Sequence, residues 1–193
     1  MKKEASNKIY QFKIILKGIK PPIWRRIQVP EDYTFWGLHM AIQNSMGWYD
    51  NHLHEFKAYH PKKGYEHSIG TPCDEFNCTA SWKEKIKNII SVDNPNSLYI
   101  YDFGDSWEHV IQLEKILQAE NGKEYPVCIG GKRACPLEDC GGFPGYQEIL
   151  NGESEFMDEY KDLDPEYFNP EEVHFEDPES SLEMKLQFAP VTL

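Results

Sequence analysis

The chain has 193 residues and a mass of 22.6 kDa, which suits one domain or one domain with an appendage. Its 40% apolar and 13% aromatic residues suffice for a hydrophobic core, which argues against wholesale disorder. No apolar run approaches the roughly 20 residues of a membrane helix, and the first residues lack the apolar stretch of a signal peptide. Five cysteines, an odd number, favour reduced thiols, so we expect a cytoplasmic protein without membrane contact.

The net charge of −12 comes mostly from one acidic segment. Residues 153–179 carry twelve acids against one lysine, whereas residues 1–26 carry eight bases against one acid. Such a segment is typical of solvated surface, although it could also fold over the basic start of the chain or mimic phosphate for a partner. The acidic balance argues against tight nucleic-acid binding by the whole chain. We expect a core domain over residues 1–152 and an acidic segment over 153–193 that docks on the core or extends it.

Local patterns predict a hairpin followed by a helix at the start of the chain. Apolar and polar residues alternate over residues 10–16 and again over 23–29, with a break between them. Helical spacing then runs from Phe35 to Met46, with Asp32 or Thr34 as the N-cap and Gly47 as the stop. This order resembles the opening of a β-grasp fold.

The rest of the chain adds strands and short helices. Residues 52–59 predict a third strand, and Ser81 with Glu84 predicts a capping box before a short helix that runs to Ile90. Residues 97–101 and 107–117 predict a second hairpin around the turn at 102–105. A Gly-, Cys- and Pro-rich loop over 127–145 precedes a short helix at 146–150, and residues 184–188 could add a last strand or dock the tail.

These elements define an α+β fold. We expect a mainly antiparallel sheet with two short helices, a β-grasp-like opening hairpin plus helix, and an acidic C-terminal segment.

Four strings together resemble a known family. In chain order they are YQFKIILKGIKPPIWRRIQVP, MGWYDNHLHEF, YIYDFGDSWEHVIQLEK and CIGGKRACPLEDCGGFPGY. They are similar to the Ri-plasmid open-reading-frame-three-like family, over about residues 8–175. The resemblance implies an association with plasmids or mobile elements, where members are also described as resolvase-type passengers of insertion elements, but it implies no mechanism. Ser106 departs from the family pattern, which has a second aspartate at that position.

The string DFGDSWEH holds the candidate catalytic groups. Asp102, Asp105, Glu108 and His109 place three carboxylates and an imidazole within eight residues at a hairpin turn. Such a group can bind a hard divalent cation and activate a water molecule. The alternative is structural, because aspartate and glycine are also the residues that turns select.

Cysteines and histidines supply two further candidate metal sites. Cys128, Cys135 and Cys140 lie in the glycine-rich loop, where three thiolates and a histidine could hold zinc, or where the thiols could simply pack as small hydrophobic groups. His52 and His54 share one face of a strand and could bind a metal or be buried histidines.

Two aromatic groups are candidates for partner binding. Trp24, Arg25 and Arg26 could stack on a base and clamp a phosphate, or they could pair with the abundant carboxylates. Trp48 and Tyr49 could line a pocket beside the two histidines.

Three classes of function remain open from the sequence. The first is a non-enzymatic binding module that engages a protein or nucleic-acid partner, because no complete catalytic set is present. The second is a metal-dependent hydrolase or nuclease that uses the DFGDSWEH groups, and the third is a structural zinc protein. We place the binding module first.

Overall fold

A computed structural model describes residues 7–74, 76–154, 160–161 and 163–188. Its strands are β1 (Lys8–Leu16), β2 (Trp24–Pro30), β3 (His54–His60), β4 (Tyr65–Gly70), β5 (Thr79–Ala80), β6 (Asn96–Tyr101), β7 (Trp107–Gln118) and β8 (Val127–Lys132). Its helices are α1 (Phe35–Met46), α2 (Ile86–Ile89), α3 (Gly142–Asn151) and α5 (Pro178–Phe188), with a 3₁₀ turn η1 (Pro170–Glu172). None of these helices is long and apolar enough to cross a membrane.

All eight strands form one sheet in the order β5-β4-β3-β6-β7-β1-β2-β8. Every neighbouring pair is antiparallel except β4 and β5. The predicted α+β class with a mainly antiparallel sheet is therefore confirmed. The sheet extends further than expected, because β4, β5 and β8 were not predicted, and β8 occupies the start of the expected loop at 127–145.

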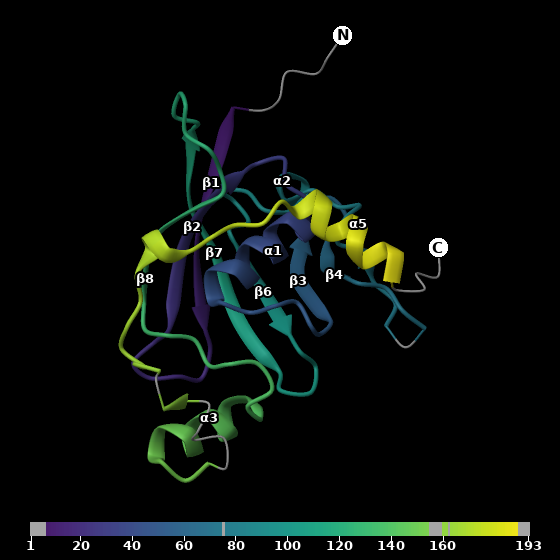
Figure 1. The fold of residues 1–193 in the computed structure, drawn as a ribbon. Coiled ribbons are helices and arrows are strands. Elements are labelled where there is room, and N and C mark those ends of the chain that lie inside the picture. The colour runs from purple at the N-terminus through teal and green to yellow at the C-terminus, as the bar shows by residue number, and fades with distance from the viewer. Residues whose placement is uncertain (1–6, 75, 155–159, 162, 189–193) are drawn as a thin grey trace.

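The opening hairpin and its helix form where the sequence predicts them. Thr34 caps α1, its hydroxyl accepting a hydrogen bond from the Gly37 amide at 3.2 Å. Gly47 ends the helix at φ 84°, a left-handed conformation that favours glycine. Helix α1 lies against one face of the sheet, and α5 lies over α1 (Figure 1). The apolar face of β1, including Phe12 and Ile14, is fully buried beneath this layer.

Two local features expected from the sequence do not form. The capping box at Ser81 does not form, and helix α2 begins only at Ile86. The polar groups of Ser81 have other partners: its carbonyl accepts a hydrogen bond from the Trp36 amide, and its hydroxyl contacts His54. Of the two alternatives for residues 184–188, the last strand does not form: these residues belong to helix α5, which docks on α1. The amide and the hydroxyl of Ser180 bond to Asp177, which supplies a helix start that outweighs the short alternation.

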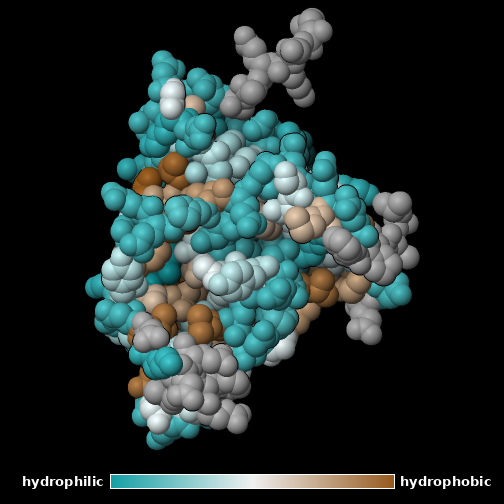
Figure 2. Space-filling model, in the orientation of Figure 1, coloured by the Kyte–Doolittle hydropathy of each residue, from teal (hydrophilic) through white to brown (hydrophobic). Residues whose placement is uncertain are grey.

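The described part of the acidic segment packs onto the core. We call residues 163–188 the strap. Its η1 turn contacts β8, and its helix α5 contacts α1. The space-filling view shows a mostly hydrophilic face with small, separate apolar groups (Figure 2). The strap is thus a folded layer of the protein, and Glu166 in it pairs with Arg133 at 2.7 Å.

Candidate metal centre

Three connecting segments meet at one end of the sheet. They are the segment before β3, the turn between β6 and β7, and the segment between β8 and α3. Their meeting follows from strand register, because His54 pairs with Tyr101 and the Asp102 amide bonds to the Leu53 carbonyl at 3.0 Å. His52 is thereby held opposite Asp102.

His52 faces two carboxylates from the other two segments. Its Nε2 atom lies 2.9 Å from Asp139 Oδ1 and 3.7 Å from Asp102 Oδ2. Neither approach is an aligned hydrogen bond, although this nitrogen is buried from solvent. A metal ion with bonds of 2.0–2.2 Å holds neighbouring ligand atoms roughly 3.0–3.4 Å apart. The two distances from His52 Nε2 are close to this spacing, and all three atoms lie within 4.8 Å of one another, so the trio is a candidate site for a cation.

Two more acids surround this trio. Asp105 accepts a hydrogen bond from the Gly141 amide at 3.2 Å, and Glu138 accepts from the Tyr101 hydroxyl and from Asn51. Across the described residues, none of the four carboxylates forms an ion pair with a lysine or an arginine. The end of the sheet thus concentrates negative charge around one imidazole. Such a place attracts a cation.

The backbone positions two of the ligands in an unusual conformation. Asp102 has φ 55° and Asp139 has φ 60°, values that few non-glycine residues adopt and that aspartate tolerates. Asp102 Oδ1 accepts from the Gly104 amide at 2.9 Å and closes the turn. Its other oxygen, Oδ2, remains for the site. The structural and the metal-binding interpretations of this aspartate are therefore compatible.

The other two candidate residues of DFGDSWEH, Glu108 and His109, point away from the trio. Glu108 pairs with Lys17. His109, the next residue along β7, is fully buried against Trp48 on the opposite face. Burial, with a smaller contribution from neighbouring Arg25, lowers the pKa of His109 to about 3. The four candidate groups of the motif do not form one cluster, and His109 cannot reach a water molecule at the turn.

The three loop cysteines do not converge either. Cys128 contacts the Gly130 carbonyl, Cys140 contacts the Gly142 carbonyl, and Cys135 lies 3.8 Å from the sulfur of Met46. Within the described ranges, no cysteine belongs to a group of converging ligand atoms. Burial raises the pKa of Cys135 to about 12, so it is a neutral thiol. Their geometry matches the packing interpretation.

His54 belongs to a second, fully buried group. Its ring stacks on that of His39, with centroids 3.7 Å apart and an interplanar angle of 12°. The Tyr99 hydroxyl and Asp50 bond to the two nitrogens of His39, each at 2.8 Å, and Lys185 of α5 reaches both oxygens of Asp50 at 2.8 Å. His39, Asp50 and His54 also lie close enough to share an ion. The stacked rings direct their lone pairs in parallel, however, and Asp50 already has a cation, so the group does not fit a metal.

Charges within this buried group follow from its hydrogen bonds. Burial lowers the pKa of His39 and, more strongly, that of His54, so both rings are neutral. Burial alone would raise the pKa of Asp50, but the bonds from His39 and Lys185 hold it below its ordinary value. The group is a buried core network that anchors α5, although His54 Nδ1 has no hydrogen-bond partner among the described residues.

Arg25 and Arg26 of the first hairpin both form contacts within the protein. Arg25 is 2% exposed, its Nε atom donates to the Ser45 carbonyl at 2.7 Å, and its guanidinium lies 3.7 Å from the centroid of the Phe168 ring. Arg26 makes a bidentate pair with Glu114 at 2.7 and 2.8 Å. Trp24 and Arg26 remain partly exposed, and the Trp24 ring lies near the charged groups of Arg26 and Lys13 on the outer face of the sheet. Arg25 is therefore unavailable to a partner.

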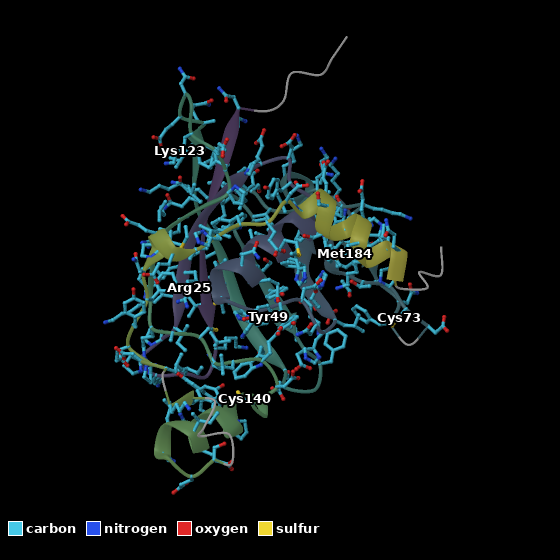
Figure 3. All side chains as sticks on the ribbon, in the orientation of Figure 1. Arg25, Tyr49, Cys73, Lys123, Cys140 and Met184 are labelled. Carbon is cyan, nitrogen blue, oxygen red and sulfur yellow. The ribbon has the colours of Figure 1, made fainter. Side chains whose placement is uncertain are left out.

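Trp48 and Tyr49 differ in their burial. Trp48 is buried, and its indole N–H donates to the Pro136 carbonyl at 2.8 Å. Tyr49 is 80% exposed on the face that Figure 3 presents, and it lines only a small surface cavity. Figure 3 also shows Cys140 beside α3, well away from Arg25.

Sequence reasoning found two members of the trio and missed the third. His52 and Asp102 were candidates, whereas Asp139, together with Glu138 and Asn51, was not. A signal for Asp139 is present in the sequence, since Glu138 and Asp139 lie between Cys135 and Cys140, in a string whose cysteines alone were considered as metal ligands.

Comparisons with known proteins agree with the resemblance. The chain is 32% identical over 144 residues to an uncharacterized protein, y4hQ, of Sinorhizobium fredii (strain NBRC 101917 / NGR234), which covers 73% of this chain and 71% of that protein. It is similar to the crystal structure of MM3350, a protein of unknown function from Methanosarcina mazei Go1. That similarity has a TM-score of 0.80 and 46% identity, covering 87% of this chain and 98% of the other. The family model described as plasmid pRiA4b ORF-3-like protein matches residues 8–177. The chain belongs to the plasmid pRiA4b ORF-3-like family.

Proposed function

We propose that the protein binds a divalent transition-metal ion through His52, Asp102 and Asp139 and acts as a metal-dependent binding module. One imidazole nitrogen and two carboxylate oxygens form a mixed ligand set that suits Zn²⁺ or Mn²⁺. Three protein ligands leave coordination positions open. Asp139 is 68% exposed at its side chain, so an oxygen atom of a protein or nucleic-acid partner can reach them.

One observation carries this proposal. The His52 Nε2 atom lies within contact of two carboxylates from two other segments without an aligned hydrogen bond to either. Two further acids stand beside them, and no lysine or arginine of the described chain balances the four charges. Buried or crowded charges are ordinarily paired or bind metals.

The test is metal binding by purified, untagged protein that has first been stripped with a chelator. Isothermal titration with Zn²⁺ and with Mn²⁺ should give one equivalent per chain. Asp139→Asn should weaken binding at least 10-fold. Because the Asp139 side chain is exposed, this substitution should not unfold the protein, and weaker binding would report the loss of a metal ligand. Glu108→Gln is the matched control, because it removes an acid of the same hairpin that faces Lys17 instead. Absence of binding, or equal binding by Asp139→Asn, would overturn the site.

A hydrolase is the second candidate, because a cation with open positions can activate water. The geometry favours the binding module, since His109 and Glu108 do not reach the turn. Incubation of the metal-loaded protein with bis-p-nitrophenyl phosphate separates the two. Turnover that disappears in Asp139→Asn would replace the binding module with a hydrolase.

A further inference from the structure

A cavity lies between the start of α1 and the strap helix α5. Its volume is about 640 Å³, which is within the range of small-molecule sites. Tyr33 and Trp82, which are partly exposed, supply aromatic surface, and Trp36, which is only 1% exposed, also borders the cavity. The residues of the proposed metal centre do not line it. It is therefore a separate feature of the molecule.

The aromatic surface is built into the fold. Tyr33 packs closely against Gly37, where an added Cβ would lie 2.8 Å from the tyrosine ring. Trp36 is held from behind by a hydrogen bond from its indole N–H to the Pro178 carbonyl at 2.8 Å. Trp36 already accepts a cation, because the Lys185 ammonium lies 5.0 Å from its ring centroid. Aromatic faces attract ammonium groups in this way.

The rim of the cavity is acidic. Asp32, Glu179 and Glu183 line it, against Lys85 alone. In the part of the chain that the structure describes, these three carboxylates make no ion pair. Two of these carboxylates act on the aromatic wall: burial, together with the charges of Asp177, Asp32 and Glu179, raises the pKa of Tyr33 to about 12.

We propose that this cavity binds a linear aliphatic polyamine. Several ammonium groups would face the three unpaired carboxylates, and the methylene stems between them would lie on the aromatic rings. A neutral or anionic ligand of the same size would leave the carboxylates unpaired. Because helix α5 forms one wall, the ligand also bridges the strap to the core.

Calorimetric titration with spermidine tests this proposal. Wild type should bind one equivalent, and the double variant Glu179→Gln/Glu183→Gln should bind at least 10-fold more weakly. The matched control is Glu171→Gln/Glu176→Gln, which removes the same charge from the same strap outside this cavity and should change the affinity less than 2-fold. Trp82→Leu should also weaken binding at least 10-fold, and thermal melting would verify that each variant is folded.

Three results would overturn the proposal. Wild type that does not bind spermidine has no such site. A control pair that loses as much affinity as the cavity pair would show general attraction by the acidic segment. Full affinity in Trp82→Leu would remove the aromatic wall from recognition. None of these results bears on the metal centre, which uses different residues.

Discussion

His109 offers a sharp test of the core, because the fold buries an imidazole there without satisfying it. It is fully buried, and neither ring nitrogen has an aligned hydrogen-bond partner in the described part of the chain, although backbone groups of Tyr99 and Trp107 lie nearby. Replacing an unsatisfied polar group with an apolar one of similar size is neutral or stabilising. We expect His109→Leu to raise the free energy of unfolding by about 1–3 kcal/mol at pH 7.

The same variant should change the response to acid. Because the pKa of His109 is lowered to about 3 in the fold, the unfolded chain, with an ordinary pKa of about 6.5, takes up the proton first. Stability from the neutral ring is complete above pH 6.5 and is lost as the pH falls toward 3. Between pH 7 and pH 5 this loss amounts to about 2 kcal/mol, so wild type should lose about 2 kcal/mol more stability than His109→Leu, which retains His39 and His54.

Urea unfolding followed by tryptophan fluorescence at pH 7, 6 and 5 measures both effects. His39 and His54 stay in both proteins, so their own pH dependence cancels in the comparison. His174→Leu is the control, since it removes an exposed imidazole and should change the free energy of unfolding at pH 7 by less than about 0.5 kcal/mol. Parallel loss of stability in wild type and His109→Leu would refute the reasoning.

The remaining predictions concern the hairpin and the strap. Arg25→Ala should lower the free energy of unfolding in urea titrations by about 3–5 kcal/mol, because it leaves buried carbonyls unpaired. Arg26→Ala removes a partly exposed ion pair and should lower it by at most about 1 kcal/mol. Equal losses in the two variants would contradict the burial assigned to Arg25. Lys185→Met should speed amide hydrogen exchange across residues 178–188 but not in β1, and unchanged exchange would show that Asp50 does not anchor α5. Gly131→Ala should lower the thermal midpoint, because a Cβ at 131 would lie 2.2 Å from the Phe168 ring. Gly130→Ala, in the same strand, should leave it nearly unchanged, because a Cβ there meets only Trp24 at 3.8 Å, and similar shifts in the two variants would contradict the packing of the strap.

The elements that sequence predicts well are those whose signals are local. Alternation and helical spacing place β1, β2 and α1, and Thr34 and Gly47 bound the helix as expected. The capping box at Ser81 fails because the polar groups of that serine serve α1 and His54, which are distant in sequence. No local pattern contains that information.

The candidate site divides along the same line. Asp102 is marked by its turn, whereas His52, expected on a strand, lies two residues before β3. The register of β3 with β6 brings the two together. Asp139 joins them only because the segment after β8 returns to the hairpin, which depends on tertiary packing. Arg25 is different: it alternates with Ile23 and Ile27, so the sequence already places it on the inner face.

Anomalous diffraction from crystals of the untagged protein grown with MnCl₂ tests the central claim most directly. The account predicts one manganese peak bonded to His52 Nε2 and to one carboxylate oxygen each from Asp102 and Asp139. A map with no peak there, from protein that binds manganese in solution, would contradict it.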